Sequence, residues 1–323
     1  MHDKEWMREF QQTADAWKTL RKTPQNCRWI AEGKACQSAT VGSHTIQRKG
    51  GLFRVSQNGQ VVTWTLAGPK GLKYQQTSIR SASVFPGYCQ DHEEVFMQAE
   101  NRGHLANERE YVEQLLRSID LAIYELEAGR DTFGRPVSEL VERAERGDSN
   151  VDLPSAIRHD MQYKDKEYAL GVLQEMRSST QKLYDAKRYS TIPYVTKVFS
   201  EPSPVCLTGL ETVNTMLGRM PLVCCVFPEL GGTRVIFATR NKDLFGHLFK
   251  EHLSLWQPDT WKRSVRWWMT YGTDNWYLSP DVFNRWTEED KDAFKEQAEL
   301  QGGASFYKES PVKLWEEDFV EGS

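Results

Sequence analysis

Residues 85–96 read FPGYCQDHEEVF: a Pro-Gly turn, then Cys89, two further residues, His92 and the start of an acidic, helix-like run. A Cys-x-x-His pair at the mouth of a helix can provide half of a tetrahedral zinc site, because zinc binds thiolate and imidazole ligands. An isolated pair of this kind is most often a coincidence in a turn. The interpretation of this stretch therefore depends on whether the chain offers two more ligands.

The composition is that of a globular protein with room for two domains. The chain has 323 residues, of which 39% are hydrophobic and 27% charged, so it can bury a substantial core without disulfide bonds. No apolar run reaches the length needed to cross a bilayer. The opening residues MHDKEWMREF lack the apolar centre of a secretory signal. These features predict a cytoplasmic protein with no membrane association.

The six cysteines fall into two sets. Three lie within the first 89 residues, near histidines: Cys27, Cys36 and Cys89. The other three lie in apolar runs typical of strands: Cys206, Cys224 and Cys225. A free cysteine in such a run usually behaves as a small buried apolar residue. The first set is therefore the candidate for metal binding, and the second set is predicted to be buried thiols.

Basic residues are concentrated at the front of the chain. Residues 1–90 hold 13 Lys and Arg against 5 Asp and Glu, and no acidic residue lies between Glu32 and Asp91. A basic surface free of carboxylates favours a polyanion such as nucleic acid. The alternative is a solvated basic face that balances the acidic remainder of the chain. Six basic residues in this window are the predicted nucleic-acid contacts: Arg48, Lys49, Arg54, Lys70, Lys73 and Arg80.

Local patterns predict an α+β protein in three parts: an N-terminal module at 1–104, a helical connecting region at 105–189 and a small antiparallel-sheet α+β domain at 190–323. The Asn58-Gly59 pair between two β-prone runs is a strong hairpin signal. Apolar spacing predicts helices at 3–21, 104–129, 135–147, 161–188, 241–256 and 281–300. β-branched apolar runs predict strands at 191–199, 221–229 and 233–240, the last two forming a hairpin.

Read in order, the front module presents Cys27, Cys36, a β-hairpin, Cys89 and His92 at the start of a helix. A zinc-binding loop, a hairpin and a helix whose first turn supplies the last two ligands is the order of a treble-clef module. These four side chains are the predicted ligands of a structural Zn²⁺. The first pair is spaced Cys-x8-Cys rather than Cys-x2-Cys. Either the loop is expanded, therefore, or His44 replaces one of the thiols.

From about residue 27 to 105 the chain resembles the HNH nucleases, whose ββα-metal site is often built on this kind of zinc scaffold. The resemblance rests on His44 in SHTI, on Asn58 in the following loop, and on the stretch CQDHE in place of the family's Cys-x-x-Cys-His. It implies that His44 is the general base, that Asn58 is the middle residue of the motif, and that Glu93 is a catalytic metal-binding residue. His92 then takes the place of a structural thiolate.

The chemistry of phosphodiester hydrolysis fits these residue types. The reaction requires a base near water and benefits from a divalent cation that stabilises charge on the phosphate. His44 can supply the base, and Glu93, with Asp91 or Glu94, can help to hold Mg²⁺ or Mn²⁺. Because residues 33–90 contain no carboxylate, a hard cation in this module must find its anionic ligand there or in another domain.

The sequence supports two hypotheses of function. The first is metal-dependent hydrolysis of nucleic acid, of DNA in preference to RNA, in bacterial antiphage defence. The second is a non-catalytic zinc-stabilised module that binds nucleic acid or protein. The rear of the chain has no phosphate-binding glycine loop and no serine-hydrolase motif. A sensing or docking role is therefore predicted for it, in which it binds a protein partner or a second copy of the chain.

Overall fold

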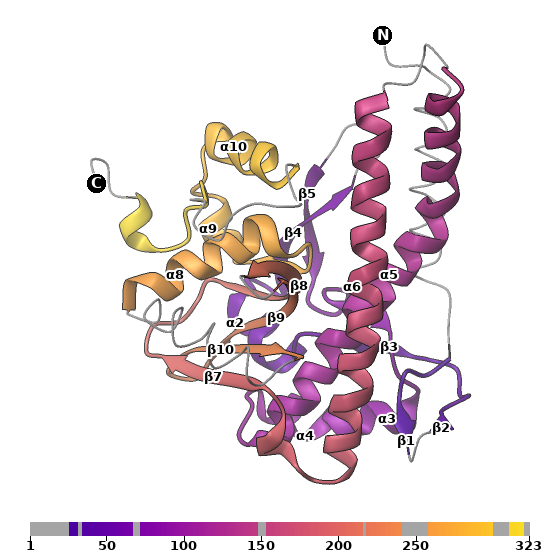
Figure 1. The fold of residues 1–323 in the computed structure, drawn as a ribbon. Coiled ribbons are helices and arrows are strands. Elements are labelled where there is room, and N and C mark those ends of the chain that lie inside the picture. The colour runs from indigo at the N-terminus through magenta and orange to yellow at the C-terminus, as the bar shows by residue number, and fades with distance from the viewer. Residues whose placement is uncertain are drawn as a thin grey trace.

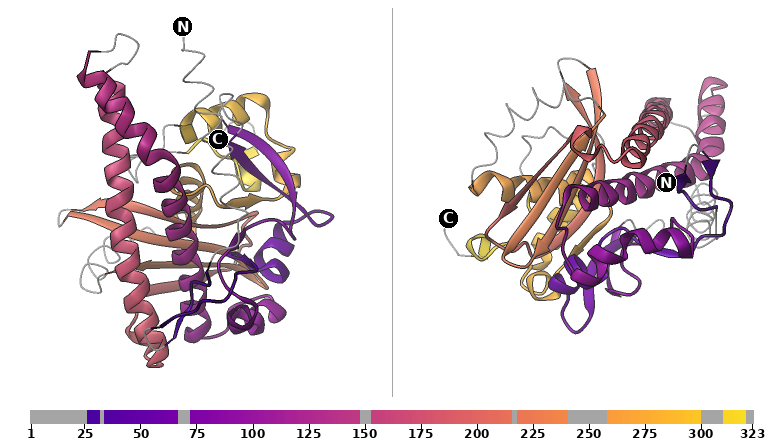
Figure 2. Two further views of the ribbon diagram at one scale, coloured as in Figure 1. Left: turned by 90° about the vertical axis from the view of Figure 1, so that its right-hand side faces the viewer. Right: turned by 90° about the horizontal axis from the view of Figure 1, so that it is seen from below.

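The described part of the chain is built around one antiparallel sheet with helices on both faces (Figures 1 and 2). The computed structural model describes residues 26–31, 34–66, 72–147, 153–215, 218–240, 258–299 and 310–319. This architecture confirms the predicted α+β class. Within those ranges, none of the helices has the length and apolarity required to span a bilayer.

Seven strands form the main sheet, in the order β5-β4-β11-β8-β9-β10-β7. Their bounds are β4 Gln60–Leu66, β5 Leu72–Ser78, β7 Tyr194–Phe199, β8 Val205–Thr215, β9 Gly218–Glu229, β10 Gly232–Thr239 and β11 Trp276–Leu278. The predicted hairpin at 221–239 is confirmed as β9–β10, which pair from Gly232↔Glu229 to Thr239↔Leu222. Strands β8 and β11 were not predicted, because β8 includes polar residues and β11 is only three residues long.

The central strands are apolar at almost every position because both faces of the sheet are buried. Successive side chains of a strand point to opposite faces. One core therefore receives Leu222, Cys224 and Val226 of β9, and the other receives Val223, Cys225 and Phe227. The run that predicted this strand shows no alternation of apolar and polar residues for the same reason.

Two long helices cover one face of the sheet, α5 at Glu108–Glu145 and α6 at Leu153–Asp185 (Figure 2). The predicted apolar stripe of α5 is confirmed: Leu115, Ile119 and Ile123 are buried against the sheet. The predicted end of this helix at Gly129 is wrong. The helix continues through the segment 135–147 that was predicted as separate, since glycine costs only about 1 kcal/mol within a helix and packing against α6 offsets it.

The opposite face of the sheet is covered by helices from the rear of the chain (Figures 1 and 2), which pack aromatic residues against it. The covering elements are α8 Pro258–Trp267, η6 Trp268–Gly272, α9 Pro280–Phe283, α10 Glu288–Glu299 and η7 Glu316–Phe319. Trp268 and Trp276 are completely buried in this core. The described tryptophans of the rear sequence are therefore packing residues. The single helix predicted at 281–300 is interrupted, because α9 ends at Phe283 and α10 begins at Glu288.

The front of the chain forms a small ββα unit. Its strands are β1 Ile30–Ala31, β2 Lys34–Ala35, β3 Gly42–His44 and β6 Val84–Pro86. Its helical segment consists of α3 Gln90–Glu93, η3 Glu94–Phe96 and α4 Met97–Arg102. Strand β3 pairs with β6, from Gly42↔Pro86 to His44↔Val84, and the helical segment follows directly. A loop, a pair of strands and a helix are therefore present, but the strands are β3 and β6, separated by 39 residues, and not the hairpin predicted around Asn58-Gly59.

The residues between β3 and β6 form an insertion, 45–83, that differs from the predicted hairpin. Asn58 and Gly59 do form a two-residue turn, with φ of 53° and 71°, between Gln57 and Gln60, which exchange backbone hydrogen bonds of 2.9 Å. The run before the turn is helical instead of extended: η1 Arg48–Leu52 and α2 Phe53–Val55. After the turn, β4 and β5 leave the front unit and join the main sheet, where β4 pairs with β11.

Several predictions fall on residues that the structure does not describe: the helices at 3–21 and 241–256, and Lys70. The predicted division at residue 104 stays a prediction. The main sheet takes β4 and β5 from the front of the chain and its other strands from the rear. A short turn, η4 Tyr189–Thr191, leads from α6 into β7.

Candidate metal centre and neighbouring polar site

Four side chains from two segments converge at the start of the helical segment: Cys27, Cys36, Cys89 and His92. The ligand atoms of these residues all lie within 4.8 Å of one another. Cys27 and Cys89 are buried, and the other two are half-buried. These are the four ligands predicted from the sequence, and the cluster could hold one metal ion.

The spacing of the ligand atoms matches a tetrahedral zinc site. With Zn–S of about 2.3 Å and Zn–N of about 2.0–2.1 Å, a tetrahedron places sulfurs roughly 3.8 Å apart and a sulfur and a nitrogen roughly 3.6 Å apart. Nδ1 of His92 lies 3.4 Å from Sγ of Cys27 and 3.3 Å from Sγ of Cys89. The sulfurs of Cys36 and Cys89 are 4.0 Å apart. A Cys₃His set is typical of structural zinc.

The unusual Cys-x8-Cys spacing results from an expanded loop. Strands β1 and β2 form a small hairpin between the two cysteines, with Ile30 opposite Ala35. The backbone N–H of Cys36 donates to the carbonyl of Trp29 at 3.1 Å, which returns Cys36 toward Cys27. The alternative in which His44 replaces a thiol is wrong, because His44 is not part of the cluster.

The Pro-Gly turn before Cys89 is fixed by close packing. A side chain at Gly87 would place its Cβ 2.4 Å from Cζ of Phe85, so only glycine fits without displacing that ring. The carbonyl of Gly87 accepts a hydrogen bond of 2.9 Å from the backbone N–H of Arg28. This contact joins the turn to the loop that carries Cys27, so both halves of the ligand set are held by one backbone connection.

Aromatic side chains enclose the metal cluster on the side of Trp29. The Trp29 ring stacks on His92 at 5.4 Å between centroids and 17° between planes. Edge contacts join the same ring to Tyr88, Phe96 and Tyr184. Packing of this kind fixes the orientation of the imidazole and excludes water from one side of the cluster.

The protonation of the thiols depends on burial. Burial raises the pKa of Cys27 to about 12, so this thiol is protonated at neutral pH unless a cation binds it. Hydrogen bonding from Ser38 lowers the pKa of the half-buried Cys36. Because metal ligation requires thiolates, binding of a metal here would release protons and strengthen as the pH rises.

A buried polar network ties this cluster to the long helices. Tyr88, next to Cys89, donates its hydroxyl to Asp120 of α5 at 2.6 Å. Arg177 of α6 donates to the same carboxylate at 2.8 Å and to the backbone carbonyl of Arg28 at 2.9 Å. Both charged side chains are at least 95% buried. The metal-binding loop is therefore held by a charge pair that has almost no contact with water.

His44 lies at the end of β3, outside the metal cluster and half-buried. Its Nδ1 is 2.9 Å from the carbonyl oxygen of Ala82. Because a carbonyl can only accept, Nδ1 carries the proton, and Nε2 of the neutral ring is free to act as a base. Burial lowers the pKa of His44; Glu100 opposes this effect, and Arg117 and Arg48 add to it. The neutral form is therefore favoured at pH 7.

Two carboxylates of the helical segment, Glu93 and Glu100, act on each other, and the charge of Glu100 also acts on His44. Glu93 forms an ion pair with Arg117 of α5. Burial raises the pKa of Glu93, although Arg117 and the neighbouring Ser43 hydroxyl favour its charged form. Glu100 accepts the backbone N–H of Lys49 at 3.1 Å. In each carboxylate the second oxygen, Oε2, is buried without a well-formed hydrogen bond among the described residues.

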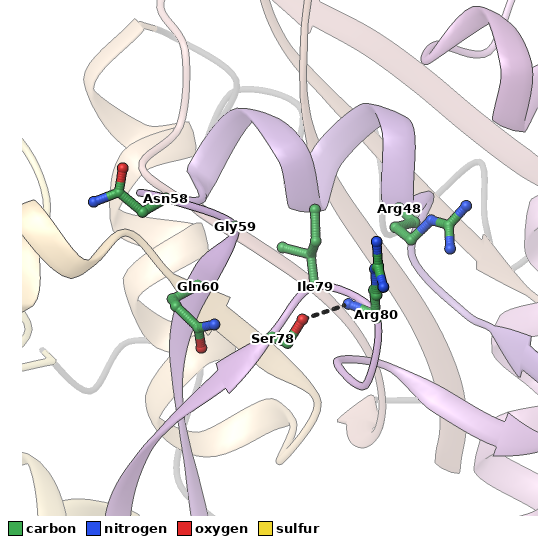
Figure 3. A pocket seen from close by; sticks show the side chains of 7 residues that line it. All are labelled: Arg48, Asn58, Gly59, Gln60, Ser78, Ile79 and Arg80. Carbon is green, nitrogen blue, oxygen red and sulfur yellow. Dashed lines mark hydrogen bonds between the residues drawn. The ribbon is translucent and has the colours of Figure 1, made fainter.

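The structure does not bring Asn58 into this site. Asn58 occupies a left-handed position in its turn, at φ 53°, which asparagine tolerates well. None of the described hydrogen bonds joins it to His44 or Glu93. Figure 3 shows its side chain on the far side of a surface hollow from Arg48. The turn accounts for this residue without a catalytic role.

The predicted basic contacts that the structure describes have different surroundings. Arg48 and Arg80 line the same hollow (Figure 3). Lys49 donates its ammonium to Asn101 at 2.8 Å. Arg54 is exposed on α2, and Lys73 is exposed near the other end of β5 from Arg80.

Sequence reasoning missed two residues of the polar site, Glu100 and Arg117. Glu100 follows Glu93 by seven residues, which places both on one face of a helix, so this signal was available. Arg117 reaches the site from α5, and no local pattern indicates a contact between elements so far apart in sequence. Comparison with protein-family models, curated proteins and solved structures finds no match to the chain.

Proposed function

We propose that the front unit is a zinc-stabilised module that hydrolyses phosphodiester bonds in nucleic acid, with His44 as the general base. The observation that carries the proposal is the hydrogen bond of 2.9 Å between His44 Nδ1 and Ala82. It leaves Nε2 as a proton acceptor on a ring that feels the charges of Glu100 and Arg48. The Cys₃His cluster holds the strand and the helix that carry these groups, and zinc there has a structural role.

In the proposed reaction, Nε2 of His44 takes a proton from a water molecule. The water oxygen forms a bond to phosphorus, the bond from phosphorus to the leaving oxygen breaks, and solvent protonates that oxygen. A base whose pKa lies near the working pH is the most effective in such a step. The guanidinium of Arg48 would stabilise the charge that develops on the phosphate oxygens.

A divalent cation, Mg²⁺ or Mn²⁺, would be held by Glu93 and Glu100. Their unpaired Oε2 atoms support this assignment, because buried oxygens without hydrogen bonds are rare and call for a partner. The two charges also repel each other, which a bound cation would relieve. Mg²⁺ commonly takes only one or two carboxylates and completes its shell with water and substrate phosphate. The chemistry supplied would be charge stabilisation on the phosphate.

One observation favours a second function, a non-catalytic module that binds nucleic acid or protein. Glu93 already has a counterion in Arg117, which would compete with a divalent cation for the same carboxylate. In this alternative His44 is a packed, hydrogen-bonded residue of β3, and zinc again holds the fold.

Cleavage assays on His44 variants distinguish the two functions. We expect the purified chain to cleave DNA or RNA with Mg²⁺ or Mn²⁺, and His44→Ala to lose cleavage while it keeps its zinc and its melting temperature. Asn58→Gly is the matched control, because glycine suits the same turn and cleavage should continue. Binding without cleavage by the wild-type chain would favour the non-catalytic module. Unchanged cleavage by His44→Ala would exclude His44 as the base.

The setting of this activity is also a proposal. Antiviral defence rests on the resemblance to HNH nucleases alone, and a cytoplasmic location rests on the sequence pattern alone. A sensing or docking role for the rear of the chain rests on the lack of any catalytic motif there.

A further inference from the structure

A surface hollow of about 590 Å³ lies on the insertion between the two strands of the ββα unit (Figure 3). Seven residues line it: Arg48, Asn58, Gly59, Gln60, Ser78, Ile79 and Arg80. All of them belong to the segment 45–83. The lining contains two guanidinium groups and no carboxylate, so the hollow favours an anion.

The two arginines of the hollow differ from most others in the structure. Arg102, Arg109 and Arg117 each form an ion pair with a carboxylate. Within the described ranges, the guanidinium groups of Arg48 and Arg80 take part in neither an ion pair nor a hydrogen bond. Figure 3 shows both side chains at the same end of the hollow. Their donors are therefore available to a ligand, and a guanidinium binds a phosphate by paired hydrogen bonds.

Arg48 also connects the hollow to the proposed catalytic base. Its charge acts on His44, so a phosphate bound by Arg48 lies near the polar site. A strand held in the hollow could continue toward His44 by way of this residue.

An exposed aromatic residue lies on the same insertion. Phe53 is 64% exposed, which is unusual for a phenylalanine. It begins α2, the short helix between Arg48 and the Asn58-Gly59 turn, both of which border the hollow. Its ring makes none of the aromatic or cation contacts found among the described side chains. Proteins bind unpaired bases by combining exposed aromatic rings with basic side chains, and this insertion offers both.

We propose that the hollow binds a phosphate of a single-stranded nucleic acid and that Phe53 stacks on an unpaired base of that strand. A duplex keeps its bases stacked on one another. Its phosphates can therefore bind the two arginines, but its bases cannot stack on Phe53. The inference rests on the nucleic-acid substrate of the proposed function, and it does not require cleavage.

Binding is measured on the full chain carrying His44→Ala, so that cleavage cannot consume the probe. The probe is a fluorescein-labelled oligothymidylate, either single-stranded or annealed to oligodeoxyadenylate, and the readout is fluorescence anisotropy over a range of salt concentrations. We expect the single strand to bind more tightly than the duplex. Arg48→Ala with Arg80→Ala should raise the Kd at least about tenfold and reduce the slope against log salt by about 0.7 per lost phosphate contact.

Substitution of Phe53 separates stacking from charge. Phe53→Ala should raise the Kd for the single strand about tenfold, leave the salt slope unchanged and have little effect on the duplex. Phe53→Leu keeps an apolar side chain but should bind the single strand nearly as weakly as Phe53→Ala does, because leucine has no flat ring. The matched control for charge is Arg146→Ala with Lys182→Ala, an exposed residue directly after α5 and an exposed residue of α6; this double variant should bind as the parent does.

Each outcome decides one of the proposals. An equal loss of binding in the control pair, or equal affinity for duplex and single strand, would overturn the inference. If the parent binds and depends on Arg48, Arg80 and Phe53 while the wild-type chain cleaves nothing, the inference stands and the proposed hydrolysis fails. If the wild-type chain cleaves by means of His44 and substitution of these three residues has no effect on binding, the proposed hydrolysis stands and the inference fails.

Discussion

The two sets of cysteines differ in whether their sulfurs converge. In the front unit, Cys27 and Cys36 of one segment meet Cys89 and His92 of another. In the main sheet, Cys206 lies on β8, and Cys224 and Cys225 are neighbours on β9. Neighbouring residues of a strand point to opposite faces, so these two thiols enter different cores. A metal site therefore depends on convergence and not on the number of cysteines in a region.

The same contrast describes how each region is stabilised. The front unit is small, its strands are short, and it depends on ligands and on the buried pair Asp120–Arg177. The main sheet buries apolar and aromatic side chains on both faces. Loss of a single polar contact should therefore destabilise the front unit far more than the sheet.

Loss of the metal cluster should have the largest effect. Cys89→Ser with His92→Ala removes two of four ligands, and we expect zinc to fall from about one per chain to a trace. Structural zinc contributes apparent binding free energies of about 10–16 kcal/mol in small zinc domains, so the front unit should unfold. Elemental analysis and limited proteolysis of residues 26–102 measure this. The matched control, Cys206→Ala, should keep its metal, and equal zinc in both proteins would contradict the assignment.

Removal of Asp120 should have the next largest effect. Asp120→Ala leaves Arg177 charged and 95% buried without its partner, and breaking a buried pair in this way costs about 3–5 kcal/mol. The exposed pair Arg240–Glu175 is the control, with side chains 52% and 64% exposed. Glu175→Ala should cost less than about 1 kcal/mol. Chemical denaturation measures the free energy of unfolding of both variants. Similar losses would show that burial does not determine how much these ion pairs contribute to stability.

The sequence predicted the parts of each region that local patterns encode. Ligand identity was predictable because Cys89 and His92 open a helix and Cys27 and Cys36 are the only other cysteines nearby. The hairpin β9–β10 was predictable from two apolar runs on either side of a glycine turn. The path of residues 45–83 was not, since β4 finds its partner β11 more than 200 residues away.

The polar site shows the same limit. His44 was predicted from its place before a strand, and the structure adds why its ring has one orientation, because the carbonyl of Ala82 comes from the far end of the insertion. Glu93 was predicted as a cation ligand, yet its partner Arg117 lies on a different helix. Contacts between elements that are distant in sequence leave no periodic signal.

Adjacent thiols on β9 should respond differently to the same substitution. Sγ of Cys225 lies 3.2 Å from the Ser118 hydroxyl and 3.6 Å from that of Thr208. A serine at 225 can keep these hydrogen bonds, and we expect Cys225→Ser to cost less than about 1 kcal/mol. Cys224 is completely buried in the apolar, aromatic core. We expect Cys224→Ser to cost about 1–3 kcal/mol, because its hydroxyl would be buried without a partner. Equal free energies of unfolding for the two variants would contradict this reading of the two faces.

The pH dependence of folding should have a contribution from the front unit, because burial changes the pKa of His44 there. The folded state lowers the pKa of His44, so it favours the neutral ring. The resulting stabilisation is complete above the unfolded pKa of about 6.5 and is lost as the pH falls through the folded pKa.

His44→Gln isolates this effect, because its amide N–H can still donate to Ala82 and its side chain does not titrate. Metal release at low pH is common to both proteins and cancels in the difference. We expect the wild-type chain to lose more free energy of unfolding than His44→Gln as the pH falls below about 6.5. The difference should be the smallest of the four effects, because the charge of Glu100 stabilises the imidazolium and partly offsets its burial. Parallel pH profiles for the two proteins would mean that burial of His44 does not contribute to the stability of the front unit.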